Sequence, residues 1–290
     1  MPIETGILTR SVGGFCDVWA GGALTRCLPR GVFRKRGEKP LPGDLVRFVR
    51  QTNGHAFLTE ILPRKNELLR PAVSNVDAVF LIFSASLPRP DYALLDRLLV
   101  QAAMRGIEPI LVLNKMDEAN AAHVAEFMAD YAAFAPLCVS AKAGEGLDAL
   151  KPLLANRVCC FAGQSAVGKS SLLNALFGWH LETGELSARG EVGKHTTRRA
   201  ELLPALGGYV CDTPGFALLE LPAPEQALID RAYPEFAEAP PCRFSDCSHR
   251  SEPDCNVRPL LAAGTLTEGR YSRYIALWNE LQERKRKEYD

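Results

Sequence analysis

The sequence of 290 residues predicts three parts: a small β-barrel at 1–70, a central α/β domain with a mostly parallel sheet at 71–222, and a helical region at 223–290. Three observations support this division. Short candidate strands broken by Gly and Pro fill the first part, apolar strands alternate with helical patterns in the second, and the third holds grouped cysteines ahead of a long helical pattern. With 47% hydrophobic residues, the chain has enough apolar material for several separate cores.

The N-terminal part is predicted to be a five-stranded barrel of the oligonucleotide-binding (OB) type. Its candidate strands are residues 6–9, 15–19, 23–28, 44–49 and 56–61. The loop 30–39 is its most basic stretch and suits nucleic acid, because cations can follow the backbone while an aromatic ring stacks on a base. The residues concerned are Phe33, Arg34, Lys35, Arg36 and Lys39. The alternative is a charged hairpin tip in solvent.

The central part alternates strands and helices. Residues 76–85 form an unbroken apolar run, typical of a strand buried on both faces, and 91–105 carry apolar side chains at helical spacing. The other expected strands are 109–113, 137–139, 158–162, 200–205 and 209–212, and the other expected helices are 118–133, 147–154 and 170–177. This alternation predicts a mostly parallel sheet covered on both faces, with ligands beyond the carboxyl ends of its strands.

The overall charge is balanced, with 34 basic and 34 acidic residues, so no global field selects a polyanionic partner. The basic excess is local, because residues 1–70 contain 12 Lys/Arg and 6 Asp/Glu. No apolar run approaches the roughly 20 residues that span a bilayer, and we expect neither a signal peptide nor a membrane partner. The nine scattered cysteines fit a reducing, cytoplasmic location.

A glycine-rich segment follows the expected strand 158–162 and matches the eight-residue phosphate-binding loop. Gly163 and Gly168 would let the backbone wrap phosphates. Lys169 would reach the terminal phosphates, and the Ser170 hydroxyl can hold Mg²⁺. The position between a buried strand and a helix start argues against an ordinary Gly-rich turn. The candidate phosphate-binding residues are Gly163, Gln164, Ser165, Ala166, Val167, Gly168, Lys169, Ser170 and Ser171.

An Asn-Lys-Met-Asp segment follows the expected strand 109–113 and suits guanine. The Asp117 carboxylate can accept hydrogen bonds from the ring N–H and the exocyclic amine of guanine. Adenine lacks that amine and would leave a carboxylate unpaired, and sites of this kind discriminate by about 10⁴ or more. Asn114 would fix the loop, and the Lys115 stem would lie against the purine. The candidate base-binding residues are Asn114, Lys115, Met116, Asp117, Ser140, Ala141 and Lys142.

An Asp-Thr-Pro-Gly segment begins at the end of the expected strand 209–212. Asp212 would hold Mg²⁺ through water and the Gly215 amide would contact the γ-phosphate, although such a tetrapeptide is also ordinary turn chemistry. Together the three segments resemble the motif set of the Ras-like GTPase superfamily, with the guanine-reading segment placed before the phosphate loop. The sequence therefore predicts a circularly permuted P-loop GTPase that binds GTP and GDP with Mg²⁺.

The C-terminal part contains a Cys-x₄-Cys-x-His-x₅-Cys pattern, formed by Cys242, Cys247, His249 and Cys255. Three thiolates and one imidazole suit one tetrahedral, structural Zn²⁺. Little apolar core surrounds them, so the metal can supply stability. The alternative, three unrelated cysteines and a surface histidine, does not explain the clustering.

Residues 269–287 read as the final helix. Its expected inward side chains are Tyr271, Tyr274, Ile275 and Trp278. The basic end, 284–287, is either a solvated helix end or an RNA contact.

A barrel, permuted GTPase segments and this Cys/His pattern, in that order, resemble the RsgA (also called YjeQ) family of small-ribosomal-subunit biogenesis GTPases. The resemblance covers nearly all of the chain. It implies binding to the small (30S) ribosomal subunit and its rRNA, a role in late maturation of that subunit, and GTP hydrolysis stimulated by it. We expect a cytoplasmic monomer.

The catalytic water has no obvious partner. Ras-like enzymes orient it with a Gln after Asp-x-x-Gly. Here that position is Phe216, which predicts slow turnover by the protein alone. By resemblance, His195 is the candidate that positions water and Lys169 the second catalytic residue; the alternative for His195 is a solvated loop histidine. Either Thr196 or Thr197 would bind Mg²⁺ and the γ-phosphate.

The sequence offers two alternative functions from other classes. In the first, the chain is an RNA-binding assembly factor for which GTP is a timing signal, and a Lys169→Ala variant would keep its activity. In the second, the chain is a metalloenzyme, which needs an open zinc position that four protein ligands deny.

Overall fold

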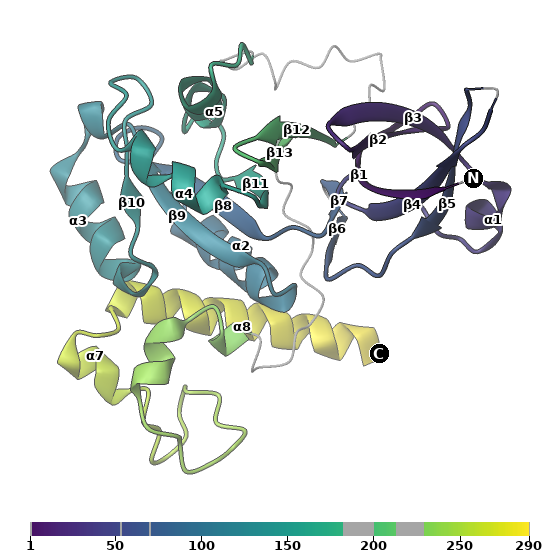
Figure 1. Ribbon diagram of the computed structural model, residues 1–290. Helices are drawn as coiled ribbons and strands as arrows, with labels where there is room; N and C mark the ends of the chain where they lie inside the picture. The colour runs from purple at the N-terminus through teal and green to yellow at the C-terminus, as the bar shows by residue number, and fades with distance from the viewer. Residues whose placement is uncertain (1, 53, 70, 182–199, 213–228, 290) are drawn as a thin grey trace, which may run out of the picture.

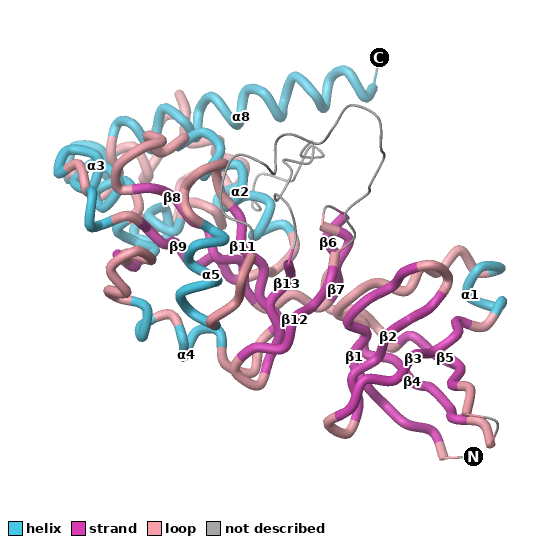
Figure 2. Tube along the Cα trace, turned by 90° about the horizontal axis from the view of Figure 1, so that it is seen from above, coloured by secondary structure: helices cyan, strands magenta, loops and turns pink. Residues whose placement is uncertain are grey.

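The computed structural model describes residues 2–52, 54–69, 71–181, 200–212 and 229–289. A barrel, a central sheet with helices on both faces and a C-terminal helical region follow one another along the chain (Figure 1). Seen from above, the antiparallel pair β6 (Glu67–Leu69) and β7 (Ala72–Ser74) lies between the central part and the barrel (Figure 2). Among the described residues, no helix combines the length and apolar character that a membrane crossing requires.

The N-terminal part is a closed five-stranded barrel, as expected. Its strands are β1 (Ile3–Val12), β2 (Phe15–Ala20), β3 (Ala23–Pro29), β4 (Leu45–Arg50) and β5 (Ala56–Ile61). They pair in the order β1-β2-β3-β5-β4, and β4 also pairs with β1, which closes the barrel. Only β3 and β5 are parallel, a pairing typical of the OB-type Greek-key barrel. The inward side chains alternate with outward ones along each strand and fill the barrel.

The basic loop differs from its expectation. Residues Gly31–Lys35 form a short helix, α1, which turns Phe33 into the barrel core, where the side chain is 3% exposed. Removing an apolar ring of this size from water is favourable, so burial in the barrel core is more stable than exposure to solvent. The expected stacking of Phe33 on a base is therefore wrong. Lys35 and Arg36 remain exposed.

The central sheet is parallel across five strands. In spatial order these are β10 (Leu137–Cys138), β9 (Glu108–Asn114), β8 (Ala78–Ser84), β11 (Val158–Ala162) and β13 (Gly208–Asp212). The strand β12 (Glu201–Ala205) runs antiparallel to β13 and continues the sheet to the barrel by pairing Glu201 with Arg10 of β1. Every residue of β8 is buried, as its apolar run predicts.

Helices cover both faces of the central sheet, and alternate residues of β8 serve different cores. Val79, Leu81 and Phe83 pack toward α2 (Tyr92–Met104) and α3 (Ala121–Asp130). Their neighbours in the strand pack toward α4 (Lys151–Leu154) and α5 (Lys169–Phe177). The helix expected at 118–133 is shorter than predicted and flanked by the 3₁₀ turns η1 (Met116–Glu118) and η2 (Ala132–Phe134), because Asn120 caps α3 through its side chain. That expected at 147–154 likewise splits into η3 (Leu147–Ala149) and α4.

The C-terminal region contains η5 (Pro234–Glu238), α7 (Pro259–Ala263) and the long α8 (Glu268–Tyr289), which runs along the central part (Figure 1). The face of α8 that is buried is Arg270, Tyr274, Leu277 and Leu281. Of the four side chains expected inside, Tyr274 is buried and the other three are only half-buried. The buried face is thus rotated slightly from the predicted one.

Buried ion pairs join α8 to α2 and α3. Arg270 is fully buried and contacts Asp96 of α2 and Glu235 of η5. Arg273 donates to the second oxygen of Asp96 at 2.8 Å and to Asp130 of α3 at 2.6 Å. Because each buried charge has an opposite partner, the C-terminal region is held on the outer side of the central domain.

Candidate functional site

The segments expected to bind nucleotide lie at one edge of the parallel sheet. Asn114 ends β9, Ser140 follows β10, Gly163 follows β11, and Asp212 ends β13. Since the strands are parallel, their carboxyl ends meet at this edge. The order of these segments along the chain does not change this arrangement, because it depends only on which strands pair in the sheet.

Asn114 connects three of the expected segments. Its fully buried side chain donates from Nδ2 to the carbonyl of Val167 in the phosphate loop (2.9 Å). Its Oδ1 accepts from the Ala141 amide, after β10 (3.1 Å). A single amide therefore positions the segment at 114–117, the segment at 140–142 and the phosphate loop against each other.

Asp117 carries a charged carboxylate at the mouth of this arrangement. The Ser140 hydroxyl donates to Asp117 Oδ1 at 2.6 Å, and Lys142 Nζ lies 3.7 Å from Oδ2. The hydrogen bond from Ser140, helped by the charge of Lys142, lowers the pKa of Asp117 below its usual value. A carboxylate kept ionised is an acceptor for two N–H groups, which is the chemistry that a guanine edge requires.

Lys115 holds the loop that precedes α2. Its backbone is left-handed, with φ of 65°, and its ammonium donates to the Leu87 carbonyl at 2.6 Å. The contact links the Asn-Lys-Met-Asp segment to the loop between β8 and α2. Met116 begins the 3₁₀ turn η1, which presents Asp117.

The two glycines of the phosphate loop are required by space as well as by conformation. Gly163 has φ of +134°, and a Cβ there would lie 2.0 Å from the carbonyl oxygen of Ile82. Gly168 has φ of +91°, and a Cβ there would lie 2.6 Å from Asn114 Nδ2. Any larger residue would push the loop away from β8 or from the Asn114 side chain.

Lys169 begins α5 and turns back into the loop. Its Nζ donates to the carbonyls of Gly163, at 3.1 Å, and Gln164. Burial lowers the pKa of this lysine, so an anion in the loop would stabilise its charged form. Ser170 is half-buried beside it, whereas Ser171 is exposed. The loop amides, the helix start and Lys169 together form an anion-binding geometry.

Gln164 has a contact that sequence reasoning missed. Its Oε1 accepts from the Asp91 amide at the start of α2 (3.0 Å), and its Nε2 donates to the Arg89 carbonyl (3.1 Å). The phosphate-loop pattern leaves this position unspecified, so no local signal marks it. The side chain ties the phosphate loop to α2, the helix that also carries Asp96.

Some expected residues lie outside the described part. These are His195, Thr196, Thr197 and Gly215, together with Phe216. Asp212 is described as the last residue of β13. The roles expected for these residues stay predictions.

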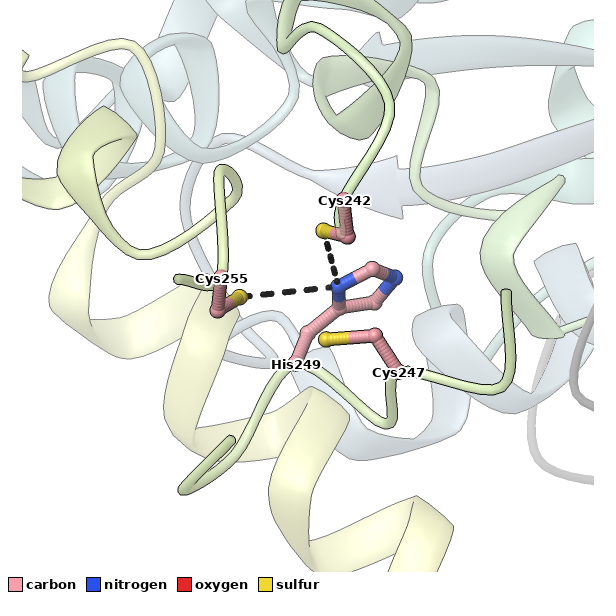
Figure 3. A group of neighbouring side chains, drawn as sticks. All are labelled: Cys242, Cys247, His249 and Cys255. Atoms are coloured by element: carbon pink, nitrogen blue, oxygen red, sulfur yellow. Dashed lines mark hydrogen bonds between the residues drawn. The ribbon is translucent and has the colours of Figure 1, made fainter. Parts of the chain in front are cut away.

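The four expected metal ligands come together in the C-terminal region (Figure 3). All four ligand atoms lie within 4.8 Å of one another. His249 Nδ1 lies 3.6 Å from Cys242 Sγ and 3.7 Å from Cys255 Sγ. Tetrahedral zinc with ordinary Zn–S and Zn–N bonds requires about 3.6 Å between nitrogen and sulfur, so the group fits this metal. Four protein ligands leave no position for a substrate.

Neighbouring groups orient the cluster. The Asn256 amide lies 3.4 Å from Cys242 Sγ and donates to it. On the other side, Asp230 Oδ2 lies 3.7 Å from His249 Nε2, which directs Nδ1 toward the cysteines. Glu252 accepts from the amides of Ser248, Arg250 and Ser251 and thereby braces the loop between two ligands.

Because the segment at Asn114 precedes the phosphate loop in the chain yet adjoins it in space, fold and site define a circularly permuted P-loop GTPase. A family model described as RsgA GTPase matches residues 61–222, and one described as RsgA N-terminal domain matches residues 5–58. The chain belongs to the RsgA GTPase family.

Related proteins cover nearly the same length. The Small ribosomal subunit biogenesis GTPase RsgA of Ruminiclostridium cellulolyticum is 41% identical over 289 residues, with 97% of this chain and 95% of the relative covered. The protein of the same name from Moorella thermoacetica is 42% identical, with 97% and 98% covered. The crystal structure of YjeQ from Thermotoga maritima has a TM-score of 0.84, 34% identity and coverage of 97% and 99%. YloQ, a circularly permuted GTPase, has a TM-score of 0.82, 33% identity and coverage of 98% and 96%.

Proposed function

We infer that this GTPase binds the small ribosomal subunit and its rRNA, assists late maturation of the subunit, and hydrolyses GTP slowly unless the subunit stimulates it. The names of the relatives support the ribosomal role. The observation that carries the nucleotide assignment is the pair of hydrogen bonds from Asn114, which sets the Asp117 loop beside the phosphate loop. The protein would act as a monomer in the cytoplasm, where such subunits mature.

The proposed roles follow the geometry of the site. Asp117 reads the guanine edge, and residues 163–171 with Lys169 hold the phosphates. Mg²⁺ would be held by Ser170, by Asp212 through water and by Thr196 or Thr197, and would offset phosphate charge. His195 would position the attacking water on the subunit.

The remaining proposals concern the rest of the chain. We assign 1–70 to the RNA-binding barrel, 71–222 to the GTPase domain and 223–290 to the metal-binding region. One structural Zn²⁺ would be held by Cys242, Cys247, His249 and Cys255. The nitrogen–sulfur distances, which are near those of tetrahedral zinc, support this assignment. The metal would stabilise the C-terminal region and take no part in hydrolysis.

The test measures nucleotide affinity and turnover with and without purified small subunits. We expect GDP and GTP to bind, ATP to bind at least about 10⁴-fold more weakly, and turnover to rise on addition of small but not large subunits. His195→Ala should retain nucleotide affinity and lose the stimulation.

A matched pair of variants checks the base reader. Asp117→Asn should abolish guanine preference, whereas Glu118→Gln, at the neighbouring exposed acid that also contacts Lys142, should retain it. Equal turnover with and without subunits, or equal ATP and GTP affinity, would refute the proposed function. Subunit maturation by Lys169→Ala at the wild-type rate would instead favour a scaffold role.

A further inference from the structure

A mixed aromatic and cationic surface lies on the outside of the barrel, over β1, β2 and β3. Along β2, Cys16 and Val18 are buried in the barrel core, so Phe15, Asp17 and Trp19 lie on the outer face. The strand register places the outward side chains in three rows: Val12 with Phe15, Arg10 with Asp17 and Arg26, and Ile7 with Trp19 and Leu24. An aliphatic and aromatic row thus lies on either side of a charged row.

The side chains of this outer face differ in exposure, and Ile7 packs against the largest hydrophobic core of the described residues. Phe15 is 42% exposed and Leu24 is 58% exposed. Trp19 is half-buried. Phe15 and Trp19 are four residues apart in one strand, which separates them by about 13 Å. Arg26 lies between them because its cross-strand partner is Asp17.

Arg26 is fixed in a stacking orientation. Asp17 accepts from Nε at 2.8 Å and from Nη2 at 3.2 Å, so the guanidinium is held through one edge. Its central carbon lies 5.7 Å from the centroid of the Phe15 ring, and 66% of the side chain is exposed. Because the Asp17 carboxylate that holds it is buried, the guanidinium loses little freedom when a planar ligand stacks on it.

We propose that Phe15, Arg26 and Trp19 form a stacking surface for unpaired bases of an RNA strand. Base stacking on aromatic rings and guanidinium planes is the usual way in which proteins read single-stranded RNA. The N-terminal part as a whole, with 12 basic and 6 acidic side chains in residues 1–70, attracts a polyanion, although Arg26 on this face is paired with Asp17. OB-type barrels bind oligonucleotides across β2 and β3 and the adjoining loops, which is where these residues lie.

The surface replaces the stacking role that Phe33 cannot fill. It rests on the proposed contact between the barrel and rRNA, and deepens that contact by naming the RNA class, single-stranded rather than duplex, and the residues that hold it. Duplex bases are already stacked on one another and offer no free face to Phe15.

The experiment measures fluorescence anisotropy of a labelled RNA of about 12 nucleotides and of its duplex, at one fixed salt concentration of about 50 mM. We expect Phe15→Ala and Trp19→Ala each to weaken single-strand binding by about 5- to 100-fold, while Phe15→Tyr and Trp19→Phe stay within about twofold of wild type. Duplex binding should be equal in all variants.

The chain offers a matched control. Phe244 is 41% exposed and lies under Arg243 at 5.6 Å, the same arrangement on the C-terminal region, so Phe244→Ala should leave RNA binding unchanged. Thermal melting of each variant verifies that the barrel is folded.

Three results would overturn the proposal: wild-type affinity in Phe15→Ala and Trp19→Ala, equal losses for strand and duplex, or an equal loss in Phe244→Ala. Co-sedimentation with small subunits separates the two levels of the argument. If the wild type binds subunits while the alanine variants bind single-stranded RNA normally, the proposed stacking surface is wrong and the proposed function stands. If binding of single-stranded RNA depends on Phe15 but the wild type binds no subunit, the stacking surface stands and the proposed function is wrong.

Discussion

Arg270 of α8 and Asp96 of α2 form an ion pair whose side chains are 0% and 2% exposed. The same guanidinium donates to Glu235 and to the Ala232 carbonyl and lies 3.9 Å from the centre of the Tyr233 ring. Asp96 also accepts from the Tyr131 hydroxyl at 2.7 Å. Nearly every polar atom of this arginine is thus satisfied inside protein, and the pair fastens the C-terminal region to the central domain.

Replacing Arg270 by Met should destabilise the protein by about 3–5 kcal/mol, because Glu235 would be left buried without its cation and Asp96 would keep only Arg273. The free energy of unfolding by urea measures the effect. Arg47→Met is the control, since the Arg47–Glu60 pair is about half exposed at both ends and should contribute at most about 1 kcal/mol. Similar losses in the two variants would contradict the assigned role of the buried pair.

Asn114→Ala should lower both stability and nucleotide affinity. The change leaves the Val167 carbonyl and the Ala141 amide without their partner, at a cost of about 1–3 kcal/mol for each group that stays buried. It also frees the phosphate loop from the base-binding loop. We expect GDP affinity to fall at least tenfold in calorimetry. Ser165→Ala, an exposed change in the same loop, should cost far less. Undiminished GDP affinity in Asn114→Ala would show that the brace has no functional part.

Ser140→Ala should make GDP binding more sensitive to acid. The Ser140 hydroxyl lowers the pKa of Asp117, so the carboxylate stays ionised above that lowered pKa. Its charge, and with it the binding of guanine, is lost only as the pH falls through that pKa. Without the hydroxyl the pKa returns toward its usual value of about 3.9, and the acid loss of affinity moves to higher pH. GDP titrations from neutral to about pH 3 test this direction, because both transitions lie near or below the usual pKa. An acid limb at the same pH in both proteins would contradict it.

Removing the metal should destabilise the segment from Cys242 to Cys255. One Zn²⁺ per chain is expected by elemental analysis, and Cys255→Ser should abolish it and lower the melting temperature, because the metal would hold the segment from Cys242 to Cys255 together. Cys138→Ser, at an exposed cysteine outside the cluster, is the control and should retain the metal. The protein with a chelator should lose stability to the same extent as Cys255→Ser. A melting temperature indifferent to chelator would argue against a structural metal.

Local sequence patterns predicted much of the secondary structure. The five barrel strands, the fully buried β8, the helix that Asp91 caps and the position of the phosphate loop all depend on local periodicity and turn residues, and the structure has each of them. The Cys/His spacing likewise places four ligand atoms together. The nucleotide roles assigned to Asp117, Lys169 and His195 stay predictions.

The predictions that were wrong or incomplete share a cause, which is a contact between residues far apart in the chain. Phe33 lies in a basic loop and reads as exposed, yet the short α1 turns it into the barrel. Arg270 shares a helical face with Tyr274, Leu277 and Leu281, but nothing near it in sequence reveals that Asp96, on α2, is its partner. Gln164 occupies an unspecified position and contacts a helix more than 70 residues away in the chain.

The sequence by itself determined the three parts, the permuted order of the GTPase segments and the four candidate metal ligands, since each depends on residue type and spacing along a few turns of chain. Only the tertiary structure decided that Asn114 joins the loops, that two buried arginines fasten α8, and that the outer face of β2 rather than α1 presents an aromatic ring. Packing makes those choices, because they depend on which distant side chains share a low-dielectric interior or an exposed face.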